Sequence, residues 1–335
     1  MKKFMKGCLI TALVLFFVGC AFYGICGVMG GFRQLKAWDG HTFRIWGHEM
    51  RLAYSGIGLW YITDRDSGSH MTEWADEEGG IGIDEQERTA YGVSDVKRLE
   101  IECGGSNLSI RESEDDYIWV AREEDAWPVR YKMQGGTFRL YSEKDFRWWD
   151  MGLRGTIYLY LPKGMNLDSI DLEIGAGKLE SIALEAGEID VEVDAGTAVI
   201  ESLSGNEVEL SVNAGGMEVR DVTAGEFSAN TGAGSLTVGN FTAENADLEA
   251  SAGSLELEGR IGRNADIECG AGSVNLRLEG AEEDYDYDLE CSMGEINLNG
   301  NTYSGLSSER TVRNGGRGVM DIECSVGSIE IKFTD

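Results

Sequence analysis

The chain has 335 residues, with 29 Lys and Arg against 59 Asp and Glu, so its formal net charge is −30 at pH 7. This charge argues against a nucleic-acid partner, because no basic excess is present to displace counterions from phosphates. Hydrophobic residues make up 42% of the chain, and 46 glycines stand against only 2 prolines. That composition disfavours disorder and collagen and predicts a folded protein of one large or two ordinary domains.

The amino terminus predicts a membrane anchor. Residues 1–6 carry three lysines, and residues 7–32 form an uncharged, mostly apolar run of 26 positions. About 20 apolar residues suffice to cross the hydrocarbon core of a bilayer as a helix. The lysines favour a cytoplasmic residue 1–6 segment. We therefore expect a single-pass protein of the cell membrane, with its carboxy-terminal part outside the cytoplasm.

Two alternatives for this segment stay open. A cleaved signal peptide would have a shorter apolar core that ends in a small-x-small site, and no such site is evident. Phe17-Val18-Gly19-Cys20 loosely resembles a lipobox, in which Cys20 would become a lipid-modified first residue, although apolar sequence continues beyond it. The segment is therefore retained, lipidated or cleaved, and an uncleaved anchor is the favoured interpretation.

Residues 33–95 lack a clear periodicity, and we interpret them as a partly ordered juxtamembrane linker. All three histidines, His41, His48 and His70, lie here. The chain contains no HExxH or GxSxG motif and no phosphate-binding loop, so no residue is predicted to be catalytic.

A repeat of 19 residues dominates residues 170–280. Apolar and polar residues alternate around an Ala-Gly pair in each repeat, which is typical of a half-buried strand. A fixed period of this size indicates stacked units, and parallel strands joined by crossover connections favour a right-handed coil. The sequence predicts an all-β fold, a right-handed parallel β-solenoid with coils of about 19 residues, after one transmembrane helix. The solenoid domain is expected to span residues 96–335.

Aligned in register, the repeats give vertical apolar columns that predict one continuous core. Neighbouring coils of such a solenoid stack about 4.8 Å apart. One column begins at Leu172 and continues through every repeat. Another runs from Leu184 to Phe241, and the sequence predicts that it ends at Arg260 and Glu279.

Each Ala-Gly pair predicts a corner of the coil. Glycine would be needed there for a positive φ and for close approach of the next coil. The motif recurs beyond the regular repeats at spacings of 22 and 33, and we expect the extra residues to be loop insertions. The predicted corner glycines are Gly177, Gly196, Gly215, Gly234, Gly253, Gly272, Gly294 and Gly327.

Four cysteines fall in the solenoid, and in this register they share one inward column. They are Cys103, Cys269, Cys291 and Cys324. No paired spacing indicates a zinc motif or a disulfide scaffold. We interpret them as buried small apolar residues rather than reactive thiols.

Carboxylates form two outward columns beside the first strand of each repeat. A solvated face that favours solubility is one interpretation, and a divalent cation, most simply Ca²⁺, bridging neighbouring coils is the other. A column of carboxylates permits calcium binding without specifying it, and no other cofactor is expected. The candidate metal ligands are Asp171, Glu173, Asp190, Glu192, Asp247, Glu249, Asp266 and Glu268.

Several spaced motifs resemble a known family. They are Val96-Lys97-Arg98-Leu99-Glu100-Ile101, Tyr160-Leu161-Pro162-Lys163-Gly164 and the recurrent Gly-Ala-Gly or Ala-Gly-Ser corners. Together they resemble the β-strand-repeat putative-adhesin family of bacterial envelope proteins over about residues 96–333. The resemblance implies a solenoid of unknown function, without an established enzymatic activity, and supplies no functional residue.

We therefore expect a membrane-anchored, extracytoplasmic β-solenoid that acts as a non-catalytic surface binding, adhesion or envelope-scaffold module. Its partner would be an envelope component or another membrane or surface protein. Two alternatives stay open, namely an acid-using polysaccharide hydrolase or lyase built on a β-helix and a self-associating structural protein.

Overall fold

The computed structural model describes residues 96–123, 126–127, 129–142, 155–304 and 308–334, together with the backbone of Arg154 and of five earlier strands. The chain divides into two units, residues 1–78 with 146–151 and residues 79–145 with 152–335. The predicted anchor, residues 7–32, lies outside the described residues. Among those that are described, no helix has the length and apolar character needed to cross a bilayer. The transmembrane helix thus stays a prediction.

The first unit contains one small sheet. Its three strands are antiparallel, in the order β1-β2-β3. They fall within the segment predicted as a linker. Their bounds are β1 Thr42–Ile45, β2 His48–Tyr54 and β3 Trp60–Asp64.

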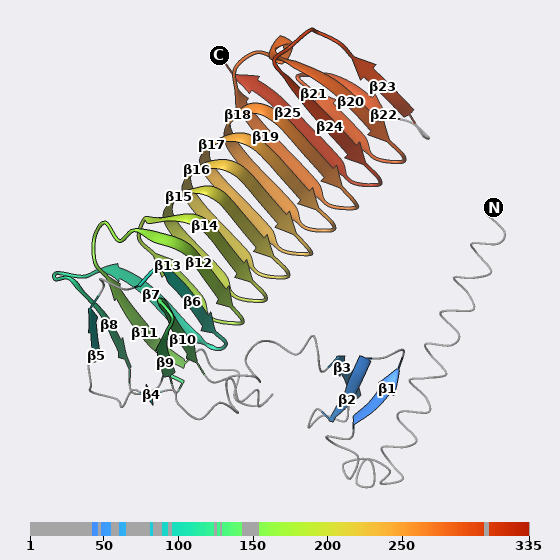
Figure 1. The fold of residues 1–335 in the computed structure, drawn as a ribbon. Coiled ribbons are helices and arrows are strands. Elements are labelled where there is room, and N and C mark those ends of the chain that lie inside the picture. Colours follow the sequence, from blue (N-terminus) through green and yellow to red (C-terminus); the bar gives the residue numbers. More distant parts are fainter. Residues whose placement is uncertain are drawn as a thin grey trace, which may run out of the picture. The chain divides into compact units, whose positions relative to one another are not determined.

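The second unit is a stack of parallel coils (Figure 1). Four central strands of 16 residues follow one another, each separated from the next by a three-residue corner. Neighbouring strands pair in parallel with a shift of 19 residues, as in Ala198 opposite Met217. The predicted parallel solenoid and its period are confirmed, whereas the right-handed coiling stays a prediction. The strands are β15 Thr197–Val212, β16 Gly216–Thr231, β17 Ser235–Ala250 and β18 Ser254–Cys269.

Each coil has three sides, which the burial pattern of β16 makes visible. Side chains alternate between core and solvent along a straight strand, so buried positions recur every second residue. In β16 this spacing becomes three after Val219 and again after Ala224, which marks two bends. With the corner, these bends divide the coil into three short segments. The buried residues are Met217, Val219, Val222, Ala224, Phe227, Ala229 and Thr231.

The core consists of columns of side chains stacked along the solenoid. The column that begins at Leu172 is fully buried from coil to coil. Burial of such apolar side chains stabilises the fold by about 1.5–3 kcal/mol each. The column contains Leu172, Val191, Leu210, Ala229, Leu248, Ile267, Ile322 and Leu289.

The predicted end of the third apolar column at Arg260 and Glu279 is wrong. Pairing between β17 and β18 slips by one residue, so Phe241 lies opposite Gly259 rather than Arg260, and fully buried Leu278 continues the column. Glycine is required at position 259, because a Cβ there would collide with the backbone of Phe241. The 19-residue register returns at Asn245 opposite Asn264.

The last coil of the sequence is not the last coil of the stack. Strand β24 pairs with β18 on one side and β20 on the other, and β25 pairs with β19 and β21 in the same way. The chain therefore skips one position, builds the terminal coil, and returns to fill the gap (Figure 1). The strands are β19 Ser273–Glu279, β20 Tyr285–Cys291, β21 Glu295–Leu298, β24 Gly318–Cys324 and β25 Ser328–Thr334.

Size complementarity between Tyr285 and Gly318 explains this order. Tyr285 lies opposite Gly318, and the fully buried Tyr285 hydroxyl donates a hydrogen bond to the carbonyl of Ile261. A Cβ on Gly318 would meet both the Arg263 carbonyl and the Tyr285 ring. Because the middle strand begins with glycine, the ring can reach past it to the coil beyond.

The expected loop insertions near the carboxy terminus contain antiparallel strands that cover the end of the stack. Strand β22 pairs with β21, and β23 pairs with β20. A short 3-10 turn, Glu282–Asp284, precedes β20. Covered ends expose fewer unpaired strands to other chains. The capping strands are β22 Asn301–Ser304 and β23 Ser308–Val312.

The amino-terminal end of the solenoid mirrors this topology. Strand β6 lies between β12 and β10, and β7 lies between β13 and β11, so the first coil is also an inner coil. Antiparallel strands β9, β8, β4 and β5 cover this end. Their bounds are β4 Ile81–Gly82, β5 Thr89–Gly92, β6 Arg98–Cys103, β7 Ser106–Glu112, β8 Tyr117–Arg122, β9 Val129–Gln134, β10 Thr137–Ser142, β11 Arg154–Leu161, β12 Leu167–Ile174, β13 Lys178–Ser181 and β14 Leu184–Val193.

Candidate binding surface

Two columns of acidic side chains run along the outside of the third segment of each coil, and we call them together the acidic face. Every member is exposed or half-buried. The first column is Glu100, Asp171, Asp190, Glu209, Ser228, Asp247, Asp266, Asp321 and Asp288. The second is Glu102, Glu173, Glu192, Ser211, Asn230, Glu249, Glu268, Glu323 and Glu290.

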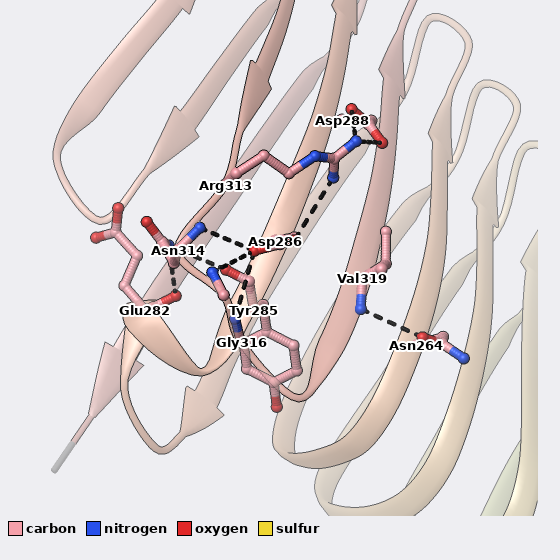
Figure 2. Close-up of polar contacts among 10 residues, drawn as sticks. Asn264, Glu282, Tyr285, Asp286, Asp288, Arg313, Asn314, Gly316 and Val319 are labelled. Atoms are coloured by element: carbon pink, nitrogen blue, oxygen red, sulfur yellow. Dashed lines mark hydrogen bonds and ion pairs between the residues drawn. The ribbon is translucent and has the colours of Figure 1, made fainter.

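Arginines stand at both ends of the first acidic column. Arg139 lies opposite Glu100 and forms an ion pair with it. At the other end, Nη2 of Arg313 lies 3.1 Å from Oδ2 of Asp288, and Arg313 also pairs with Asp286 (Figure 2). The register positions between Glu100 and Asp288 hold only carboxylates and one serine. Charge is thus compensated at the ends of this column and concentrated along its length.

The loop that carries Arg313 is held by Asp286. One carboxylate oxygen of Asp286 accepts hydrogen bonds from the backbone N–H groups of Asn314 and Gly315, both 2.8 Å, and of Gly316, 3.4 Å (Figure 2). Desolvation acts to raise the pKa of Asp286, but these three bonds hold it below the ordinary value. The loop therefore presents Arg313 to Asp288 in a defined position.

Repulsion within the acidic face changes the acidity of its members. Desolvation between stacked strands, followed by the charges of Glu209, Asp171 and Glu192, raises the pKa of Asp190 to about 6. Desolvation also raises the pKa of Asp266, with Asp247 and Asp321 adding to it. Like charges stacked one strand apart repel, so the native fold holds these carboxylates ionised at a cost.

The candidate metal ligands fall into two separate groups on this face. Asp171 lies opposite Asp190 and Glu173 opposite Glu192, while Asp247 lies opposite Asp266 and Glu249 opposite Glu268. Between the groups, the columns carry Ser211, Ser228 and Asn230 beside Glu209. Within the described part of the chain, no three His, Cys, Asp or Glu side chains converge as a metal site would need. Calcium binding stays a prediction.

Close packing between coils, and not a positive φ, is what requires glycine at the corners. All eight corner glycines lie outside the left-handed region, contrary to the positive φ expected for them. A Cβ on Gly215 would lie well under 3.0 Å from the carbonyl of Gly196, a separation that real Cβ atoms do not show. The corners thus stack backbone on backbone, which keeps the acidic face regular from coil to coil.

The four solenoid cysteines lie in the inward column predicted for them and are buried. Burial raises the pKa of Cys103 to about 12 and that of Cys324 to about 11. Thiols with raised pKa are poor nucleophiles, because the thiolate is the reactive form. Cys103 lies at the opposite end of the domain from the other three, opposite Ser142 and Ile174.

Comparison with known proteins identifies the domain. Residues 96–332 match the Toastrack DUF4097 family. The chain belongs to that family. The resemblance to bacterial adhesin-like proteins of unknown function is thereby confirmed. No curated protein matches the chain.

Solved structures with a similar Toastrack-like fold come from gut bacteria. A putative adhesin from Bacteroides fragilis is 15% identical, with 76% of this chain and 98% of that chain covered and a TM-score of 0.43. A putative adhesin from Parabacteroides merdae is 12% identical, with 73% and 95% covered and a TM-score of 0.41. A putative lipid binding protein from Parabacteroides distasonis is 17% identical, with 73% and 96% covered and a TM-score of 0.37.

Two shallow grooves of the Toastrack domain were not predicted from the sequence. One, of about 430 Å³, lies where Pro162-Lys163-Gly164 and the interruption at Ile182 and Ala183 break the regular coil. The other, of about 330 Å³, lies beside Glu256, Asn275 and Glu330. Neither groove is lined by a residue of the acidic face. Only the Pro-Lys-Gly turn gave a sequence signal for the first of them.

Of the three histidines, His48 lies in β2, where only the backbone is described, and His41 and His70 lie outside the described residues. The acidic face is therefore the most extensive chemically uniform feature of the described Toastrack domain. Sequence reasoning found its columns but missed the arginines at their ends, because Arg139 and Arg313 come from segments outside the regular repeat.

Proposed function

We propose that this chain is a non-catalytic surface binding module of the bacterial envelope. Residues 7–32 anchor it in the cell membrane, and the Toastrack domain lies outside the cytoplasm. The apolar run and its flanking lysines support this placement. The partner is an envelope component or another membrane or surface protein.

The acidic face is the part of the domain that meets this partner. The observation that carries the proposal is the register of its two columns, which repeats carboxylates from coil to coil between Arg139 and Arg313. Strands in a sheet lie about 4.8 Å apart, so a partner with closely spaced positive charges would find several carboxylates at once. Complementary charge of this kind promotes encounter and selects partners.

The repetition also favours binding over catalysis. Glycoside hydrolysis by two carboxylates needs one pair with distinct roles, set apart by its surroundings. In the acidic face, equivalent pairs such as Asp171 with Asp190 and Asp247 with Asp266 recur along the stack. A uniform array suits a ligand that is itself repetitive.

Binding of the full-length chain in detergent to an amine-bearing polysaccharide, with uncharged dextran as the control polymer, tests the proposal. One variant combines Asp247→Asn with Asp266→Asn in the acidic face. A matched variant combines Glu218→Gln with Glu256→Gln, which removes the same charge from exposed positions on another side of the coil.

We expect the acidic-face variant to bind at least about threefold more weakly, because each exposed ion pair contributes up to about 1 kcal/mol. The matched variant should bind as the unchanged chain does. Equal losses in both variants would show that net charge alone governs binding, and equal binding of dextran would show that charge is irrelevant. Either result contradicts the proposal.

A further inference from the structure

Three cysteines lie side by side at the point where the last coil fills the gap in the stack. Cys269 in β18 lies opposite Cys324 in β24, and Cys324 lies opposite Cys291 in β20. In the sequence Cys291 comes between the other two, but in space Cys324 does. The returning coil therefore places its cysteine against one thiol on each side.

The geometry suits a covalent bond between neighbours. Residues paired in register on adjacent strands lie about 4.8 Å apart, within the Cα separation of 4.4–6.8 Å typical of disulfides. Cys269 and Cys324 already interact through a hydrogen bond between their thiols. Their side chains are 2% exposed, so the bond would form inside the core.

Corner glycines bound the space that these thiols occupy. A Cβ on Gly327 would meet Sγ of Cys269, and a Cβ on Gly294 would meet Sγ of Cys324. Sγ of Cys324 also lies 3.2 Å from the carbonyl of Gly327. The absence of side chains at the two corners leaves the sulfur atoms facing the neighbouring coil rather than a methyl group.

We propose that Cys269 and Cys324 form a disulfide that locks the last coil into the stack. Two thiols lose two protons and two electrons, and a small-molecule or protein disulfide accepts them and is reduced to two thiols. In the folded chain burial raises the pKa of both thiols and disfavours attack. The exchange therefore takes place before β24 and β25 dock, or when they open.

The bond would close a loop across the whole carboxy-terminal cap. Such a crosslink stabilises a fold mainly by restricting the unfolded chain, and more so for long loops. Its presence in the cell requires an oxidant, which depends on the placement outside the cytoplasm proposed above. Its formation in purified protein does not depend on that placement.

The test uses the full-length chain with Cys8→Ser, Cys20→Ser and Cys26→Ser, refolded from urea in a mixture of oxidised and reduced glutathione. Crosslinked peptides are then identified by mass spectrometry without reduction. We expect one peptide that joins Cys269 to Cys324. Cys291→Ala and Cys103→Ala should both retain it, and Cys324→Val, which places in this column a residue that other coils carry there, should remove it.

Oxidised protein should melt at least about 5 °C above the same protein kept reduced. Cys324→Val, which needs no disulfide chemistry to fold, should show no difference between the two conditions. A crosslink only between Cys291 and Cys324, glutathione adducts alone, or free thiols in protein that has refolded would each overturn the proposal.

Discussion

Cys269 and Cys324 lie opposite each other in neighbouring parallel strands, although the whole carboxy-terminal cap separates them in the sequence. This pairing makes β25 an inner strand, with β19 on one side and β21 on the other. The carboxy-terminal segment of the chain is thus part of the core of the stack. The stability of this end of the domain depends on residues that a simple linear solenoid would place at an edge.

Hydrogen exchange of β25 tests this topology. Because both edges of the strand are paired, we expect the amides of Ile329 and Ile331 to exchange as slowly as those of the central coils. Ile331 is fully buried, and Ile331→Ala should lower the free energy of unfolding by about 2–5 kcal/mol. Lys332→Ala, at the exposed next position, should change it by less than about 1 kcal/mol. Rapid exchange throughout β25 would contradict the inner position.

The repeat made most of the central stack predictable. A 19-residue shift gives every pair between β15 and β16, including Leu210 opposite Ala229. The order of the last coils was not predictable, because Asp288-Leu289-Glu290-Cys291 and Asp321-Ile322-Glu323-Cys324 follow the same pattern. Either could pair with the coil of Cys269, and the choice depends on Tyr285 passing over Gly318, which is a tertiary contact.

The acidic face was predictable as two columns and unpredictable in its ends. Periodicity placed Asp171 and Asp190 next to each other, as the structure has them. The slip at Gly259 was hidden, because one residue is lost on one side of the bend and regained before Asn264. Arg139 and Arg313 carry no repeat signal, since strand pairing at the two caps alone brings them to the columns.

The corners offer a matched pair of glycines for mutation. A Cβ on Gly215 would collide with the Gly196 carbonyl, whereas a Cβ on Gly216 would meet only Oγ of Ser235 at an ordinary 3.4 Å. We expect Gly215→Ala to lower the free energy of unfolding by about 2–3 kcal/mol, because the backbone must shift. Gly216→Ala should change it by less than about 1 kcal/mol. Urea denaturation measures both, and equal effects would show that corner contact is not what selects glycine.

The raised pKa of Asp190 predicts that stability rises as the pH falls. Its folded pKa is about 6, above the value of 3.8 for an unperturbed carboxyl, so the native state binds more protons between about pH 4 and 6. Unfolding then becomes harder as the pH falls from 7 towards 5. Asp190 is solvent-exposed, and after screening we expect Asp190→Asn to stabilise the fold at pH 7 by less than about 1 kcal/mol. Melting temperatures at pH 7 and pH 5 measure this effect.

Asp221 is the control for that substitution. Hydrogen bonds from Arg220 and Asn240 hold the pKa of Asp221 below its ordinary value. Asp221→Asn should therefore lower the melting temperature at pH 7, the opposite direction to Asp190→Asn. A decrease for both variants would show that the repulsion inferred for Asp190 does not control stability.

Calcium, if it bridges the stacked carboxylates, should stabilise the native state by mass action. We expect millimolar CaCl₂ to raise the melting temperature more than NaCl at the same ionic strength does. The double variant Asp247→Asn with Asp266→Asn should reduce that difference, whereas Glu218→Gln with Glu256→Gln should preserve it. A calcium effect no larger than that of sodium would remove calcium from the account.

Carboxyl footprinting of the bound complex tests the central claim most directly. The full-length chain is labelled with a carbodiimide and an amine in the presence and absence of an amine-bearing polysaccharide, and each carboxylate is read by mass spectrometry. We predict protection of Asp247, Glu249 and Asp266 in the acidic face, with Glu218 and Glu256 labelled equally in both conditions. Protection confined to Glu218 and Glu256, or spread evenly over all exposed carboxylates, would contradict binding through the acidic face.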